Sequence, residues 1–278
     1  MQETLYTHSY LYYGVNEALD RTTEVVQVRA GAPAGSTIDH PCFNQGTVLN
    51  FTAAVTAGLA TNFVGSSNYT ACEAAVLALL GLDAPCLTDP KEPTSIAIGY
   101  PELEDETEAG GFGGNSAGLG AVHRNSHDVQ LDLLQSLSPG VDAAGQVPYP
   151  STNRSTCAVR GTYQAPIGAE VSFVAFSQYS FLWSFYGLDN DTATVDQLGQ
   201  AGAELCGMTW SEAVAAHPGV PGGFLVNYCF TTTYAYALLK FGLRIPADEP
   251  GRVRVAPAAE DLGWALGSMF VEANSAAF

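Results

Sequence analysis

The most regular pattern of apolar positions in this chain lies between residues 225 and 239. The recurring side chains fall on one face of an α-helix when they are placed at 3.6 residues per turn. Gly242 and Pro246 follow the pattern and are typical of a helix end. We therefore predict a long helix whose buried face carries Leu225, Tyr228, Cys229, Thr232, Tyr236 and Leu239.

Three more helices are predicted from their start signals. In each, a threonine is followed three positions later by Glu or Gln, the capping-box spacing that satisfies free N–H groups of a first helical turn. Gly81 supplies a stop for the first of these helices, and residues 15–28 are predicted to form one more. The capping pairs are Thr70 and Glu73, Thr194 and Gln197, and Thr209 and Glu212.

Extended segments are predicted between these helices. Residues 6–13, rich in Tyr, Thr and Ser, favour a strand or a strand–helix junction. Residues 47–63 favour a hairpin, and residues 173–176 (FVAF) favour a buried strand. The Pro- and Gly-rich residues 31–45 are expected to form a loop. Extended segments that alternate with capped helices indicate an α/β fold.

Residues 87–156 differ from the rest of the chain. They are acidic first, then Gly-rich, then rich in Pro and Ser, and we predict a flexible surface insertion. The run GGFGGNSAGLG inside it lacks the Lys-Ser/Thr ending of a phosphate-binding loop, and no predicted strand leads into it. His123 and His127 have the spacing of a metal pair, but without an H-E-x-x-H context we favour a linker over a metal site.

The charge balance narrows the range of functions. The 278 residues include 10 Lys and Arg against 28 Asp and Glu, for a formal net charge of −18. A protein that binds the nucleic-acid backbone needs the opposite balance, so we exclude that class. An acidic protein that binds a polyanionic ligand needs divalent cations or backbone N–H groups between the two.

Cysteines and glycosylation sequons indicate a secretory compartment. The chain has six cysteines with wide spacings and no C-x-x-C motif, and N-x-S/T sequons at Asn50, Asn68, Asn153 and Asn190. This pattern favours disulfides over buried free thiols, and six cysteines allow 15 pairings. The first residues nevertheless resemble no signal peptide. No run is long and apolar enough to span a bilayer, so a membrane anchor is not visible in this sequence.

No complete active site is evident. The H-E-x-x-H motif is absent, and the G-x-S-x-G match GNSAG, residues 114–118, lies inside the Gly-rich run of the predicted linker. Isolated histidines such as His8 and His217 are expected to be structural. Two stretches remain as candidates. In residues 173–188, Ser177 is expected to cap a helix that carries Tyr179, Phe181, Trp183 and Phe185. Most of these rings are expected in the core, but aromatics two positions apart point to different sides, so one is left free to stack on a flat base.

The second candidate is DLGWALGSMF, residues 261–270. Glu260 or Asp261 is expected to cap a helix whose buried stripe begins at Leu262. Gly263 in the first turn costs about 1 kcal/mol relative to Ala. Close approach of a phosphate to the free N–H groups of the helix end explains such a glycine. Packing alone also explains the pair of Gly263 and Trp264, and physical reasoning alone leaves both alternatives open, with packing favoured.

DLGWALGSMF closely resembles the last conserved motif of the apyrase, or ecto-nucleoside triphosphate diphosphohydrolase, family. Other blocks earlier in the chain are also similar to segments of this family and occur in the same order. Together the blocks span nearly the whole chain except about residues 89–153. These blocks are YTHSYLYYGVNEA, HPCFNQG, FVGSSNYTACEAAVLALL, CAVRGTYQAP, FVAFSQYSF and NYCFTTTY.

The resemblance implies an actin-like fold of two ribonuclease-H-like α/β domains. It implies hydrolysis of terminal phosphates of nucleoside tri- and diphosphates, with Ca²⁺ or Mg²⁺. Residues 1–255 would form part of the second domain, and residues 256–278 a C-terminal helix that packs on the first. By the same resemblance, Asp261, Gly263 and Trp264 would line the phosphate and metal end, and Phe181 with its neighbour Tyr179 would stack on the base. The implied disulfides are Cys42–Cys72, Cys86–Cys157 and Cys206–Cys229.

One departure from the family is large. Its two phosphate-binding loops and its catalytic glutamate precede the YTHSYL segment and have no counterpart in this sequence. We therefore expect the C-terminal part of an apyrase-like enzyme, inactive by itself, from the extracellular space or the secretory lumen. The absent signal peptide fits a chain that begins within a domain. The alternative is a non-catalytic, disulfide-bonded secreted binding module or pseudoenzyme.

Overall fold

A three-stranded sheet forms one edge of the molecule. The computed structural model describes residues 13–31, 35–51, 61–82, 157–164 and 166–256. In the sheet, β1 (Thr37–His40) pairs in parallel with β3 (Thr61–Gly65), and β2 (Val48–Phe51) pairs antiparallel with β3. The predicted hairpin is therefore confirmed. The loop expected over residues 31–45 is wrong in part, because β1 forms there with Ile38 and His40 buried on its inner face.

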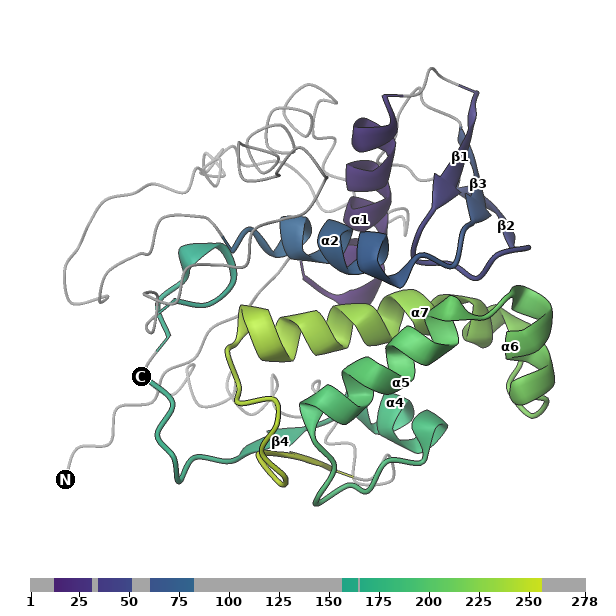
Figure 1. The fold of residues 1–278 in the computed structure, drawn as a ribbon. Coiled ribbons are helices and arrows are strands. Elements are labelled where there is room, and N and C mark those ends of the chain that lie inside the picture. Colours follow the sequence, from purple (N-terminus) through teal and green to yellow (C-terminus); the bar gives the residue numbers. More distant parts are fainter. Residues whose placement is uncertain (1–12, 32–34, 52–60, 83–156, 165, 257–278) are drawn as a thin grey trace, which may run out of the picture.

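Two helices pack against this sheet through a shared hydrophobic cluster (Figure 1). Helix α1 (Val15–Ala30) confirms the helix predicted over residues 15–28, and α2 (Tyr69–Leu80) ends at Gly81 in the left-handed conformation, as predicted. The start of α2 differs from the prediction. Asn68 is the N-cap, and its side-chain oxygen accepts a hydrogen bond from the backbone N–H of Ala71. Asparagine is among the best N-cap residues. The prediction that Thr70 caps this helix is wrong, because the helix begins two residues earlier and Thr70 lies in its first turn.

Helix α7 (Gly222–Ala237) runs through the middle of the molecule (Figure 1). The three-stranded sheet, α1 and α2 lie on one side of it, and α4, α5 and the second sheet lie on the other. The one-sided burial predicted for this helix is incomplete, because Phe230, Tyr234 and Ala237 are buried as well as the predicted face. A helix that is apolar around its circumference is typical of a core position. It continues as one π-helical turn, Leu238–Gly242.

The remaining helices pack around α7. Helices α5 (Val195–Gly207) and α6 (Trp210–Ala216) begin with the predicted capping boxes, in which Thr194 and Thr209 each exchange hydrogen bonds with the residue three positions later. Helix α4 (Gln178–Tyr186) lies beside α5. A short 3₁₀ turn, η1, covers Val159–Gly161.

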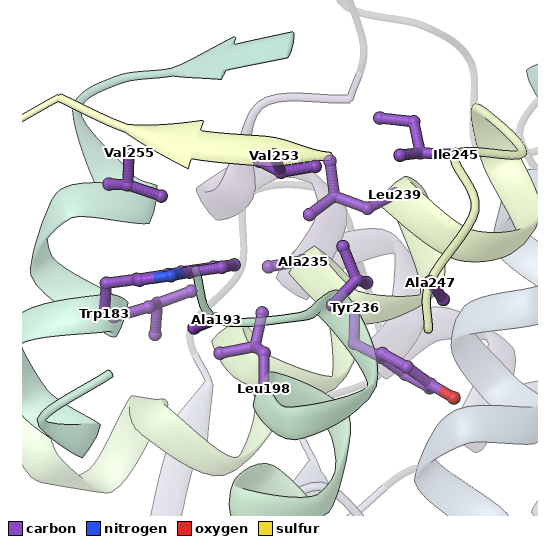
Figure 2. Close-up of a cluster of buried hydrophobic side chains, with 12 residues drawn as sticks. Trp183, Ala193, Leu198, Ala235, Tyr236, Leu239, Ile245, Ala247, Val253 and Val255 are labelled. Atoms are coloured by element: carbon purple, nitrogen blue, oxygen red, sulfur yellow. The ribbon is translucent and has the colours of Figure 1, made fainter. Parts of the chain in front are cut away.

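A second, two-stranded sheet consists of β4 (Phe173–Ala175) and β5 (Val253–Val255), paired in parallel. Its inner face joins the largest hydrophobic cluster among the described residues, in which Val253 and Val255 of β5 are buried together with Trp183 of α4 (Figure 2). Ala235, Tyr236 and Leu239 of the central helical segment complete this cluster. The cluster fixes α4 and β5 relative to α7, and so it positions the candidate site.

Two disulfides reinforce this arrangement. Cys42–Cys72 joins the segment after β1 to α2, and Cys206–Cys229 joins α5 to α7, with Cα–Cα distances of 4.8 and 4.9 Å. Both are among the three predicted pairs. Cys157 is disulfide-bonded as well, but Cys86 lies outside the described residues, so the Cys86–Cys157 pair stays a prediction.

The described part of the chain is a mixed α/β structure with small sheets, which agrees with the predicted class. The predicted insertion over residues 87–156, the extended segment before Tyr13 and the C-terminal helix after Ala256 lie outside the described residues. The division into a partial second domain and a returning helix therefore stays a prediction.

Candidate functional site

The candidate site lies at the edge where the two parallel strands end. Phe173, Val174 and Ala175 pair with Val253, Arg254 and Val255, so both strands finish at the same side of the sheet. Beyond them, the N–H of Ala256 donates to the carbonyl of Ala175 at 2.9 Å. In open α/β sheets, ligands bind outside the carboxyl ends of parallel strands. The carboxyl ends of β4 and β5, at residues 175 and 256, are therefore the candidate ligand edge of the described structure.

Helix α4 begins at this edge after a sharp turn. Its N-cap, Ser177, has φ 58° and ψ −115°, a left-handed conformation that is strained for a residue with a Cβ. The side chain of Ser177 makes no capping hydrogen bond, which corrects the prediction that it caps the helix in the usual way. Ser180, one turn later, donates its hydroxyl to the carbonyl of Ala256 at 2.6 Å. This bond holds the first turn of α4 against the end of β5.

Two faces of α4 have opposite environments. Leu182 and Trp183 are fully buried, whereas the ring of Phe181 is 52% exposed. Helical geometry separates neighbouring side chains by about 100°, so anchoring Trp183 in the core leaves Phe181 outside. An exposed, rigidly held phenyl ring at the ligand edge is suited to stack on a flat base.

The strand before α4 is also less buried than the sequence predicted. We expected a buried strand over residues 173–176, but Val174 is 55% exposed and Phe176 is 38% exposed. Val174 and Phe176 therefore add exposed apolar surface on the segment that leads into α4.

Tyr179, the predicted neighbour of Phe181, has a different environment. It is partly buried and packs against the main hydrophobic cluster. Burial raises the pKa of its phenol to about 12, so the hydroxyl stays protonated at neutral pH. Of the two aromatic residues predicted to contact a base, Phe181 is the one that presents its ring to solvent.

Arg252 positions the segment that leads into this edge, and the sequence pattern did not single it out. Its buried guanidinium donates to the carbonyls of Gly168, Ala169 and Val171, and it forms an ion pair with Glu249. These contacts fix the loop before β4 to the turn before β5. Lys and Arg are scarce in this sequence, with ten among 278 residues, so each is worth inspection. No sequence motif around Arg252, however, predicts its structural role.

The predicted phosphate end cannot be placed. Asp261, Gly263 and Trp264 lie outside the described residues.

A metal centre is not evident in the described ranges, which contain no group of three His, Cys, Asp or Glu side chains able to hold an ion. These residues therefore do not fit a Ca²⁺ or Mg²⁺ site by themselves.

His40 is a structural residue. Its Nδ1 accepts from the N–H of Cys42, and the Thr23 hydroxyl lies 3.2 Å from its Nε2. Burial lowers the pKa of His40 to about 3, so it remains neutral.

Comparison with known proteins identifies the family. The GDA1/CD39 (nucleoside phosphatase) family model matches residues 2–107 and 147–278. The chain therefore belongs to the GDA1/CD39 family, as the sequence motifs indicated. The unmatched residues, 108–146, fall inside the segment predicted as an insertion.

Individual relatives agree with this family. Bovine ectonucleoside triphosphate diphosphohydrolase 8 is 27% identical over 273 residues, which cover 96% of this chain and 42% of the bovine protein. Probable apyrase 3 of Arabidopsis thaliana is 21% identical over 97% of this chain and 44% of its own length. Human ectonucleoside triphosphate diphosphohydrolase 2 is 33% identical over 143 residues, 49% of this chain and 27% of the human protein. The chain spans less than half the length of these curated relatives.

The Cys42–Cys72 and Cys206–Cys229 disulfides are of the kind that forms and persists in oxidising compartments. Among the helices that the structure describes, none has the length and apolar character required to cross a membrane.

Proposed function

We propose that this chain forms the nucleobase-binding portion of an apyrase-like hydrolase. The complete enzyme would release the terminal phosphate of nucleoside tri- and diphosphates with a divalent cation. The chain would supply part of the second ribonuclease-H-like domain through residue 255, and residues 256–278 would form a helix toward the first domain. By itself the chain would release no phosphate in this proposal, because the resemblance implies that the family's phosphate loops and catalytic glutamate precede the segment similar to YTHSYL.

The observation that carries this proposal is the position of Phe181. The ring is exposed at the carboxyl ends of β4 and β5, on a helix anchored by Leu182 and Trp183. An aromatic ring held there gives a purine or pyrimidine a rigid platform that does not depend on base identity. Family membership supplies the second support, because the matched family is described as one of nucleoside phosphatases.

The phosphate and cation would lie beyond this platform. In the proposal, Asp261, Gly263 and Trp264 line the phosphate end, and Ca²⁺ or Mg²⁺ neutralises phosphate charge. The net charge of −18 supports a site in which a divalent cation, and not lysine side chains, neutralises the phosphate groups of the substrate. The family's enzymes and the oxidised cysteines favour the secretory lumen or the extracellular space.

Equilibrium binding of ADP to the purified chain in the presence of Ca²⁺ tests the platform. Base–aromatic stacking contributes about 1–3 kcal/mol, so Phe181→Ala is expected to weaken binding about 5- to 150-fold. Phe181→Tyr keeps the ring and should bind as the parent does. Phe224→Ala is the matched control, because Phe224 is also an exposed phenyl ring, 69% exposed, but it lies in the first turn of α7 and not on α4. Equal losses in Phe181→Ala and Phe224→Ala would contradict the assignment.

A further inference from the structure

We propose that Asn68 carries an N-linked oligosaccharide in the folded protein. The chain has four N-x-S/T sequons. Two of them, at Asn68 and Asn190, have both the asparagine and the hydroxyl residue within the described part of the chain. They differ in how the folded structure surrounds the acceptor, and that difference selects Asn68.

Asn68 lies at the surface between β3 and α2. Both Asn68 and Thr70, the hydroxyl residue of the sequon, are exposed. The backbone N–H of Asn68 donates to the carbonyl of Pro41 at 3.2 Å, so the sequon sits on a fixed turn. A bulky, solvated sugar is compatible with such a position and incompatible with a packed one.

The hydrogen bonding of the Asn68 amide is compatible with the modification. Its oxygen accepts from the N–H of Ala71 at 3.1 Å and so caps α2. Its nitrogen, the atom that receives the sugar, has no hydrogen bond to any described residue. Transfer from a lipid-linked oligosaccharide diphosphate forms a bond between this nitrogen and the anomeric carbon. The bond from that carbon to the diphosphate breaks, and the amide nitrogen loses one proton. The carbonyl oxygen survives, so the helix cap is retained.

A disulfide close to this sequon favours the oxidising lumen as the compartment in which the chain folds. Cys72, four residues after Asn68, is bonded to Cys42. Disulfides form in the oxidising lumen, where lipid-linked oligosaccharides are also transferred. The Asn190 sequon is less suited, because Asn190 is partly buried and its carbonyl accepts from the N–H of Val255 at 2.9 Å.

Peptide mass spectrometry of the chain secreted from a eukaryotic cell tests the proposal. Enzymatic release of N-glycans in ¹⁸O-water converts a glycosylated asparagine to ¹⁸O-labelled aspartate. We expect this label at position 68. Thr70→Ala removes the sequon and keeps the Asn68 cap, so it should abolish the label, whereas Thr70→Ser preserves the sequon and should retain it.

Asn68→Asp provides a second check, because aspartate also caps a helix. This variant should be secreted with one oligosaccharide fewer than the parent. Secreted, disulfide-bonded protein with unmodified Asn68 would overturn the proposal. The result does not depend on nucleotide binding, so it is distinguishable from failure of the proposed function.

Discussion

The close contact between α5 and α7 leads to a prediction with a definite sign. A Cβ built on Gly199 of α5 would lie 2.5–2.8 Å from three ring carbons of Tyr236 on α7. The ring cannot move away freely, because its hydroxyl accepts from the ammonium of Lys240 at 2.8 Å and lies 3.4 Å from Asp196. Gly199 therefore permits the approach of the two helices.

Two opposing effects decide the stability of Gly199→Ala. Alanine in place of glycine inside a helix stabilises it by about 1 kcal/mol. Overpacking a buried contact costs typically about 1–3 kcal/mol, and the distances here place the cost near the upper end. We expect a net loss of about 1–2 kcal/mol, which corresponds to a fall in Tm of about 2–8 °C for a chain of this size.

Urea unfolding of the oxidised protein, followed by circular dichroism, measures this loss. Gly207→Ala is the matched control in the same helix, because a Cβ added at Gly207 would meet no atom within 4 Å. The control should gain up to about 1 kcal/mol from helix propensity alone. A Gly199→Ala protein as stable as the parent, beside a normal Gly207→Ala control, would refute the packing argument.

Two further predictions concern buried charge. Burial raises the pKa of Glu24, which is 6% exposed, to about 7 from 4.5. Its folded-state pKa exceeds the unfolded one, so its stabilising effect is complete below pH 4.5 and is lost as pH rises to 7. Glu24→Gln should therefore be more stable than the parent by about 3 kcal/mol at pH 8 and equal at pH 4, measured by urea unfolding at both pH values. Arg252→Ala leaves three carbonyls without their donor and should cost about 3 kcal/mol, whereas Arg252→Lys should recover only part of it. Equal stability of the two Arg252 variants would contradict the role of the planar guanidinium.

The sequence predicted helices better than strands, for a physical reason. Capping boxes at Thr194 and Thr209 are local, so their hydrogen bonds form where the spacing indicates. The strands β1 and β5 contain four and three residues, and what stabilises them is their pairing with distant partners. Val253 pairs with Phe173, 80 positions earlier, and no local pattern indicates such a contact.

The candidate site could be predicted only in part. The argument that aromatic residues two positions apart cannot share one face agrees with the structure, where Trp183 is buried and Phe181 is exposed. The sequence did not predict which strands would end beside this ring. It also did not predict Ser180 as the residue that joins α4 to β5, because that bond crosses 76 positions.

The central proposal is that this chain contributes the base-binding portion of a nucleotide hydrolase and does not perform hydrolysis by itself. The most direct test is phosphate release from ADP by the purified 278-residue chain in Ca²⁺ or Mg²⁺. We expect no release above the rate of the buffer, under conditions where ADP binds and Phe181→Ala weakens that binding. Robust, metal-dependent release of phosphate would contradict the account, because the chain would then contain a complete active site.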